Sequence, residues 1–253
     1  MRIVISPAKK LYEGSALQNF PHTQPSFLQQ AQTLIDILQE KDAFDIANLM
    51  KLSMKLADLN VQRYQSWHTP FTADNAKQAL FSFAGDVYQG LDAQTLFNDD
   101  INFAQEHLRI LSGLYGMLRP LDLMQPYRLE MGTRLANDKG SNLYDFWGDT
   151  ITEQLNLELQ ADGTLINLAS TEYFKVIQAK LLQANIITPT FKENKAGTYK
   201  VIGIYAKKAR GLMTRYIIQN RISDVQAIKN FDMDGYSYNP SLSDNKNWVF
   251  SRG

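Results

Sequence analysis

Strand-like and helix-like patterns alternate along this chain, and this alternation limits the folds open to it more than any other feature. Residues 3–6 ("IVIS") are typical of a buried strand, whereas residues 45–59 ("DIANLMKLSMKLADL") place apolar side chains at helical spacing. Residues 185–193 ("NIITPTFKE") and 198–206 ("TYKVIGIYA") are typical of strands, and the turn-like "NKAG" joins them. Interspersed elements of both kinds, with some strand pairs adjacent, predict a mixed α/β (α+β) fold.

Size and composition allow one large domain or two small ones. With 44% hydrophobic residues the chain can bury a substantial core, and no apolar run reaches the roughly 18 residues of a membrane-spanning helix. The absence of cysteine excludes disulfides, thiolate nucleophiles and Cys-ligated metals, and the three histidines are far apart in sequence. The N-terminal "MRIVISPAKK" has no cleavage-site pattern. We therefore expect no metal or other cofactor, and we take a monomer as the expected state.

Positive charge is concentrated in one segment of a chain that is neutral overall. The 26 Lys and Arg residues balance the 26 Asp and Glu residues, so a general affinity for polyanions is not expected. Residues 205–221 ("YAKKARGLMTRYIIQNR") nevertheless carry five cations and no acid. These cations are Lys207, Lys208, Arg210, Arg215 and Arg221. The sequence therefore favours a local anion-binding site in this segment.

On a helix over about residues 206–221, these cations and an apolar stripe fall on different sides. The stripe consists of Ala209, Leu212, Met213, Tyr216 and Ile217. Gly211 falls among the cations, where the lack of a side chain would let a phosphate backbone approach. Lys207 and Lys208 lie near the expected N-terminus of the helix, where the macrodipole disfavours cations unless an anion binds. The alternative is a solvated helix whose cations pair with the acidic segment 86–106.

A second group of cations, between residues 108 and 135, consists only of arginines. Its members are Arg109, Arg119, Arg128 and Arg134. Between the first two, "SGLYG" (112–116) interrupts a helical pattern that begins near Asp100. This predicts a helix-hairpin-helix-like element over about residues 100–125, whose backbone N–H groups would hold phosphates without reading sequence. The alternatives are a plain helix end at the glycines and an Arg–carboxylate network that uses Asp122 and Glu130.

Two other features of the sequence point toward enzyme chemistry. Ser6 and Lys9 in "ISPAK" have the spacing of a Ser/Lys nucleophile pair, although this motif is short and common. A small-molecule pocket could also form from "QPYRLEMG" and "YDFWGD", with candidate residues Tyr127, Arg128, Glu130, Tyr144, Asp145 and Trp147. Glu130 or Asp145 could act as a general base on a nucleotide or another phosphorylated molecule if burial raised its pKa. No recognisable nucleophile–base pair accompanies them, so no catalytic residue is assigned.

Several longer motifs resemble the YaaA family of bacterial peroxide-stress-resistance proteins. They are "ISPAK", "FAGDVYQGL", "LSGLYGMLRPLDLMQPYRLEMG", "YDFWGD", "INLAS" with "EYF" after it, and "YAKKARGLM", and they extend from Met1 to about Tyr238. The resemblance implies one compact domain over residues 1–253, of an unusual mixed α/β fold with a helix-hairpin-helix element and a basic groove that binds DNA. It also implies a cytoplasmic protein associated with peroxide stress and with limiting unincorporated iron, and hence Fenton damage to DNA.

Carried over to this sequence, the resemblance implies DNA contacts from the hairpin, the basic helix and the "ISPAK" loop. The implied DNA-binding residues are Lys9, Arg109, Ser112, Gly113, Gly116, Arg119, Lys207, Lys208, Arg210 and Arg215. Lys10 departs from the family pattern by adding charge, and the tail after Tyr238 diverges. Few aromatics interleave with the cations at 207–215, which disfavours a single-strand stacking platform. No recognition-helix pattern with Asn or Gln beside Arg suggests base readout. Duplex or branched DNA bound without sequence preference is therefore favoured, while an enzyme for a phosphorylated molecule and a scaffold for a protein partner remain alternatives.

Overall fold

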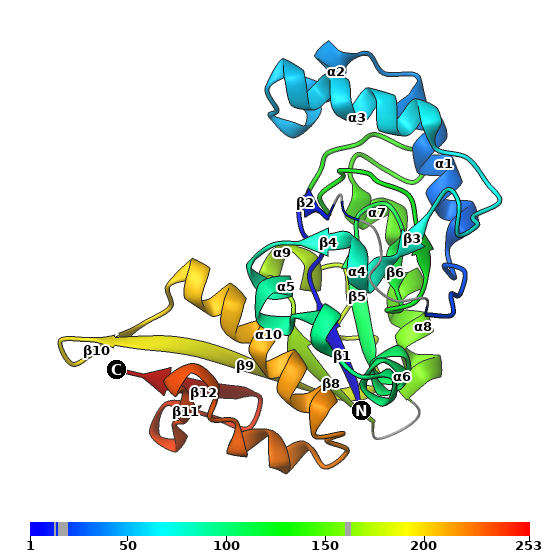
Figure 1. Cartoon of the computed structure of the whole chain (residues 1–253). Helices are drawn as coiled ribbons and strands as arrows, with labels where there is room; N and C mark the ends of the chain where they lie inside the picture. The colour runs from blue at the N-terminus through cyan, green and yellow to red at the C-terminus, as the bar shows by residue number, and fades with distance from the viewer. Residues whose placement is uncertain (13, 15–19, 160–162) are drawn as a thin grey trace.

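Strands and helices alternate along the chain, as the sequence predicts (Figure 1). The computed structural model describes residues 1–12, 14, 20–159 and 163–253. The strands are β1 Arg2–Ile5, β2 Lys10–Leu11, β3 Lys77–Gln78, β4 Phe83–Ala84, β5 Leu108–Ser112, β6 Gly116–Leu118, β7 Leu123–Met124, β8 Gly163–Leu168, β9 Ala184–Lys195, β10 Thr198–Lys200, β11 Ser237–Tyr238 and β12 Asn247–Arg252. The α-helices are α1 Leu28–Gln39, α2 Ala43–Met50, α3 Met54–Ser66, α4 Ala79–Ser82, α5 Asp86–Leu91, α6 Asn98–His107, α7 Leu143–Trp147, α8 Thr150–Leu159, α9 Thr171–Phe174 and α10 Gly203–Gln219. The 3-10 helices are η1 Ala93–Thr95, η2 Val225–Asn230, η3 Met233–Gly235 and η4 Pro240–Leu242.

Eight of the described strands form one mixed sheet at the centre of the molecule. Their order is β11-β12-β9-β8-β1-β5-β6, with β10 paired to β9. β1 lies between β5 and β8 and runs parallel to both, with Ile3 opposite Leu108 on one side and Ile166 on the other. β9 and β12 extend the parallel part, whereas β6, β10 and β11 are antiparallel to their neighbours. A parallel centre that is covered on both faces explains why "IVI" in β1 and "LINL" in β8 are nearly continuous apolar runs.

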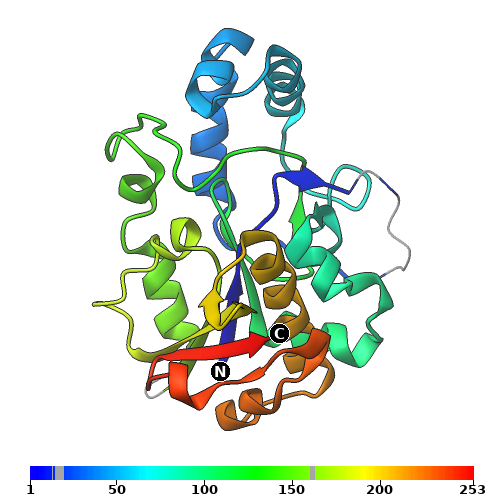
Figure 2. The same ribbon diagram turned by 90° about the vertical axis from the view of Figure 1, so that its left-hand side faces the viewer.

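Helices cover both faces of the parallel strands. Figure 2 shows α7 and α8 on one side of the strands and α4 to α6 on the other. α10 packs against β9 and against α5. One connected core runs through these layers and includes Ile3, Leu34, Ile110, Leu155 and Ile217. The mixed α/β fold of a single domain, predicted from the sequence, is confirmed.

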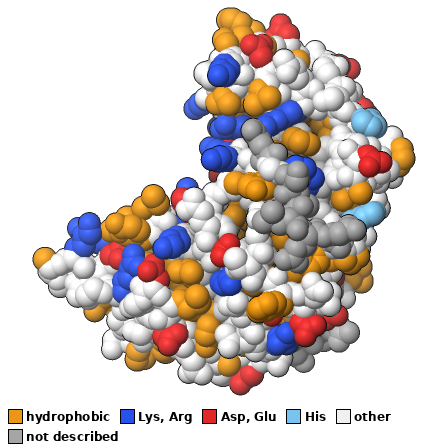
Figure 3. Space-filling model, viewed as in Figure 1, with side chains coloured by type: hydrophobic (Ala, Val, Ile, Leu, Met, Phe, Trp, Pro, Cys, Tyr) orange, Lys and Arg blue, Asp and Glu red, His pale blue; other side chains and the backbone are white. Residues whose placement is uncertain are grey.

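Two parts of the chain project from this body and border a concave face (Figures 1 and 3). The first arm consists of α2 and α3, which pack on each other, and of β2, which faces α3 across a hollow. The second arm consists of the β9–β10 hairpin and the N-terminal half of α10. The hairpin turns at Ala196 and Gly197, whose φ values of 51° and 82° match a type I′ turn. The predicted turn at "NKAG" is confirmed. The strand predicted over residues 198–206 is too long, since β10 ends at Lys200 and α10 begins at Gly203.

The predicted helix-hairpin-helix-like element is wrong in its second half. α6 ends at His107, and residues 108–118 form the antiparallel strands β5 and β6. "SGLYG" is the turn of a β-hairpin and not a break between two helices. Periodicity alone does not separate a short apolar run such as "LRIL" from a buried helix segment. The run becomes a strand because β1 pairs with it on one side and β6 on the other.

α5 and α10 cross with their backbones in contact, and a glycine in each helix makes this possible. A Cβ on Gly211 would lie 1.9 Å from the carbonyl oxygen of Val87, and one on Gly90 would lie 2.2 Å from the carbonyl oxygen of Lys208. The sequence places Gly211 among exposed cations, open to a phosphate backbone, and that prediction is wrong. Gly211 is buried against α5, so it serves helix packing.

Substitution of Gly211 by alanine tests this crossing. In an open helix the change would raise the free energy of unfolding by about 1 kcal/mol. Here the new Cβ meets backbone, so we expect a fall of about 3 kcal/mol, measured as a lower urea midpoint at unchanged m-value. Gly203→Ala is the matched control, because a Cβ there meets nothing within 4 Å and should leave stability unchanged or slightly raised. Equal effects of both substitutions would contradict the close crossing.

Candidate functional site

α10 carries a packed side and a cationic side. Ala209, Met213 and Ile217 are fully buried, and Leu212 and Tyr216 are half-buried, which confirms the apolar stripe predicted from the sequence. On the rest of the helix, Lys207 and Lys208 are exposed and Arg210 is half-buried. We call these three cations the basic face of α10.

The basic face has little carboxylate to neutralise it. Lys207 and Arg210 have no hydrogen-bond or ion-pair partner within the part of the chain that the structure describes. Lys208 has a loose ion pair, with 3.9 Å between its Nζ and Oδ2 of Asp234. Burial lowers the pKa of the Arg210 guanidinium, and no carboxylate offsets that loss of hydration. An anion at this face would supply the missing counter-charge.

The other two cations of the segment have structural partners. Arg215 Nη1 donates hydrogen bonds of 2.9 Å to the backbone carbonyls of Leu91 and Asp92, at the C-terminal end of α5. Arg221 Nη2 lies 3.5 Å from a carboxylate oxygen of Asp99 and 3.6 Å from one of Asp100. For Arg215 and Arg221, the alternative of pairing with the acidic segment 86–106 is therefore confirmed. Arg215 lies apart from the basic face because its guanidinium already holds α5.

The hairpin residues that the sequence assigns to DNA lie inside the molecule. Ser112 is fully buried, and its hydroxyl lies 2.6 Å from that of Tyr127. The carbonyl of Gly113 accepts a 3.0 Å hydrogen bond from Nε1 of Trp147. Gly116 has a φ of 67° and packs against the same indole ring. These three residues therefore shape the core, and a phosphate backbone cannot reach them.

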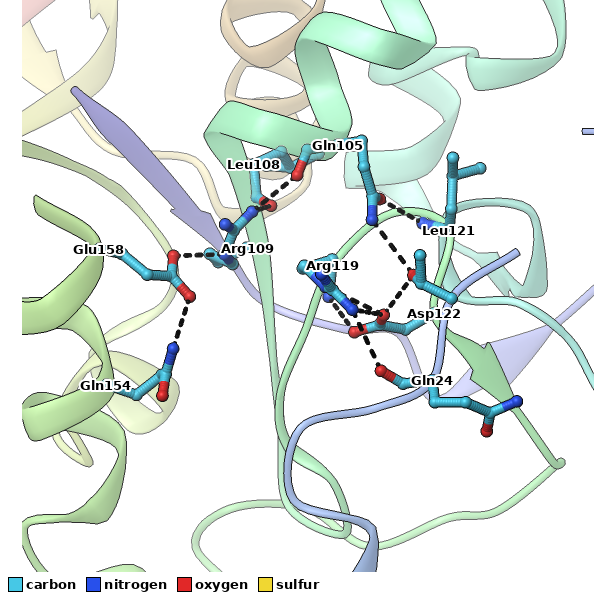
Figure 4. Close-up of polar contacts among 10 residues, drawn as sticks. Gln24, Gln105, Leu108, Arg109, Arg119, Leu121, Asp122, Gln154 and Glu158 are labelled. Atoms are coloured by element: carbon cyan, nitrogen blue, oxygen red, sulfur yellow. Dashed lines mark hydrogen bonds and ion pairs between the residues drawn. The ribbon is translucent and has the colours of Figure 1, made fainter. Parts of the chain in front are cut away.

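Arg109 and Arg119 also lie in internal networks (Figure 4). Arg109 is 4% exposed, and its Nε donates to Oε2 of Glu158 at 2.7 Å. Burial lowers the pKa of Arg109, which its attraction to the Glu158 carboxylate partly offsets. Arg119 donates to the buried Asp122 and to the carbonyl of Gln24. The Arg–carboxylate network offered as an alternative is thus present at Asp122, and the predicted DNA contact of Arg109 is corrected to a buried ion pair.

Lys9 and Arg128 share the carboxylate of Glu130. Lys9 Nζ lies 3.0 Å from Oε1 of Glu130, and Arg128 Nη2 lies 3.1 Å from the same oxygen. Ser6 is engaged elsewhere, because its Oγ accepts a 2.8 Å hydrogen bond from the backbone N–H of Ser170. The structure therefore joins Lys9 to Glu130 and not to Ser6, which removes the support for a Ser/Lys nucleophile pair.

The six residues of the predicted small-molecule pocket have different surroundings in the part of the chain that the structure describes. Tyr127 and Trp147 are buried in the core, and burial raises the pKa of Tyr127. The hydroxyl of Tyr144 donates to the backbone carbonyl of Glu172, 2.9 Å away. Asp145 is exposed and accepts hydrogen bonds from Ser141 N and Asn142 Nδ2, at the start of α7. Of the six, Arg128 lines a surface hollow and Glu130 supports it through the shared ion pair.

Lys and Arg side chains gather on both arms, on either side of the concave face (Figure 3). On the second arm they come from the basic face of α10 and from exposed Lys195 and Lys200 on the hairpin. On the first arm they line a hollow of about 630 Å³ between β2 and α3. The cations of this hollow are Lys9, Lys10, Arg63 and Arg128. Arg63 was not predicted as a site residue, because no local pattern distinguishes it from an ordinary exposed arginine of a helix.

Neither a metal-binding cluster nor a membrane-spanning helix is found among the described residues. No group of three or more His, Cys, Asp or Glu side chains there could hold a metal ion. Within the same ranges, no helix has both the length and the apolar character needed to cross a membrane.

Comparison with known proteins identifies the family. The family described as "Peroxide stress protein YaaA" matches residues 1–242. The chain belongs to this family. A UPF0246 protein of Hahella chejuensis is 59% identical over 254 residues, and one of Colwellia psychrerythraea is 58% identical over 254 residues. Both alignments cover 100% of this chain and 99% of the relative. The family resemblance predicted from the motifs is confirmed.

Removal of the Arg109 side chain tests whether it is structural. Arg109→Met would leave the carboxylate of Glu158 with Arg2, 3.4 Å away, as its remaining ion pair among the described residues. We expect the free energy of unfolding in urea to fall by about 3 kcal/mol. Arg134→Met, at an exposed position, is the control and should change stability by less than about 0.5 kcal/mol. If Arg109→Met left stability unchanged and weakened DNA binding, Arg109 would instead be a DNA-contacting residue.

Proposed function

We propose that this protein binds duplex or branched DNA through the concave face, without base-specific readout, as part of the peroxide stress response. The observation that carries the proposal is the placement of cations on both arms around one concave face of a chain whose net charge is zero. Bound as a monomer, the protein would cover DNA and limit iron-driven (Fenton) damage to it. Membership of a family described as peroxide stress proteins supports this role.

The chemistry of the basic face supports phosphate contacts. Lys207 and Lys208 are exposed on the side of α10 opposite its packed stripe, and Arg210 lies beside them without a carboxylate partner among the described residues. Lysine presents a mobile point charge, and arginine can bind a phosphate in a bidentate manner. Cations of this kind bind the DNA backbone through release of condensed counterions. Their affinity should therefore fall steeply with salt.

The types of side chain around the cations of α10 favour binding without base readout. Exposed Asn or Gln beside Arg would be needed to recognise adenine and guanine edges in the major groove. On the outer side of the N-terminal half of α10 the neighbours of the cations are Ile204 and Tyr205, both exposed. Such residues give shape and apolar contact but no hydrogen-bond code for bases. The proposal therefore predicts similar affinity for duplexes of unrelated sequence.

Charge reversal on the basic face tests DNA binding. Lys207→Glu combined with Arg210→Glu should abolish binding to a labelled duplex in fluorescence anisotropy, because attraction for phosphate becomes repulsion. For the wild type, log K against log[salt] should fall by about 0.9 for each phosphate contacted. Thermal stability should stay nearly unchanged, since neither side chain pairs with another described group.

The matched control reverses the same amount of charge elsewhere. Lys180→Glu combined with Lys246→Glu changes two exposed lysines that belong to neither α10 nor the first arm. This control should retain wild-type affinity at every salt concentration. Equal loss of affinity in both double variants would mean that net charge, and not the basic face, governs binding.

Protection of DNA is the second test. Wild-type protein at saturating concentration should reduce the nicking of plasmid DNA by Fe²⁺ and hydrogen peroxide, measured on agarose gels. The Lys207→Glu/Arg210→Glu variant should leave nicking at the level without protein, whereas the Lys180→Glu/Lys246→Glu variant should protect. Equal protection by the first variant would show that protection does not follow from DNA binding.

A further inference from the structure

The hollow on the first arm differs in chemistry from the basic face of α10. It lies between β2 and α3, has a volume of about 630 Å³, and carries the side chains of Lys9, Lys10 and Arg128. Leu56 and Leu59 of α3 and Tyr12 after β2 line it as well. Small-molecule sites typically have volumes of roughly 300 to 1,000 Å³. The hollow therefore combines positive charge with an apolar wall.

The charge of the hollow is only partly neutralised. One carboxylate, that of Glu130, is shared by Lys9 and Arg128. Lys10 is exposed and has no carboxylate partner among the described residues. The shared carboxylate holds Lys9 and Arg128 beside each other. It offsets only one of the positive charges of Lys9, Lys10 and Arg128, so these four side chains together are positively charged. A phosphate group would complete this arrangement.

A buried acceptor at the hollow provides an independent observation. Asn60 is among the lining residues and is 1% exposed. Its Nδ2 donates a 2.7 Å hydrogen bond to the carbonyl of Leu56. This contact identifies the other terminal atom of the amide as the oxygen Oδ1. Oδ1 is buried and has no hydrogen-bond partner among the described residues. Buried polar atoms are nearly always paired, so this oxygen is an acceptor at the hollow that lacks a donor.

We propose that the hollow binds a nucleotide. Its phosphate would lie against Lys9, Lys10 and Arg128, and an N–H of its base would donate to Oδ1 of Asn60. The base would pack on Leu56, Leu59 and Tyr12. A nucleotide carries a phosphate for the cations, an N–H donor for Asn60 and a flat base for the apolar side chains. A phosphorylated sugar has no such base and would leave the leucines without a partner.

Titration of the full chain by calorimetry tests the proposal, with deoxyadenosine monophosphate, deoxyadenosine and inorganic phosphate as probes. The monophosphate should bind saturably and more tightly than either part alone. Lys10→Gln should weaken it about tenfold, because it removes a charged partner of the phosphate. Asn60→Leu should weaken it about fivefold while the melting temperature stays the same or rises, since an unpaired buried oxygen is removed. Lys180→Gln, at an exposed site on neither arm, should bind as the wild type does.

The same chemistry could come from a free nucleotide or from one nucleotide of a DNA strand, and the variants distinguish them. Loss of monophosphate binding in Lys10→Gln and Asn60→Leu supports a free nucleotide. No monophosphate binding, together with weaker binding of a single-stranded oligonucleotide by both variants, supports a nucleotide within a strand. If neither ligand responds to the two substitutions, the proposal is overturned. The Lys207→Glu/Arg210→Glu variant should still bind the monophosphate, so failure here is separable from failure of DNA binding.

Discussion

The close contact between α5 and α10 determines where the cations of the second arm can lie. Gly90 and Gly211 let the two backbones touch, with a carbonyl oxygen of each helix placed where the other would otherwise carry a Cβ. Arg215, one turn further along α10, then reaches the last carbonyls of α5. The crossing thus turns one side of α10 toward the core and leaves Lys207, Lys208 and Arg210 on the other. A bulkier residue at either glycine would rotate or displace the helix that carries the basic face.

Cations in this chain divide by the chemistry of their side chains. Arg109, Arg119 and Arg215 form the internal contacts, since a planar guanidinium can satisfy several acceptors at once when it is buried. The exposed positions on both arms are mostly lysines, whose flexible stems keep the charge in water. Some acidic side chains, such as Glu158 and Asp122, pair with arginines away from the concave face. A chain with no net charge can therefore present a positive concave face.

Features set by local sequence were predictable, and features set by distant partners were not. The apolar stripe of α10 and the turn at Ala196 and Gly197 follow from spacing and turn chemistry, and the structure contains both. The hairpin at "SGLYG" was missed because "LRIL" becomes a strand only through pairing with β1, about a hundred residues away in sequence. The ion pair of Arg109 with Glu158 and the buried amide of Asn60 depend on contacts that no local pattern encodes. The resemblance to a family supplied the peroxide-stress context, which neither spacing nor charge could have given.

The two arms offer different chemistry to one concave face, and this difference has a consequence for binding. Among the described residues, the basic face of α10 offers charge without an unpaired buried acceptor, which suits a repeating phosphate backbone. The hollow on the first arm adds apolar walls and the unpaired oxygen of Asn60, which suit a single nucleotide. Because the net charge is zero, attraction beyond the Debye length of about 8 Å is weak at physiological salt, and binding depends on short-range contacts. A nucleic acid that reaches both arms would gain from each, whereas a free nucleotide would use the hollow alone.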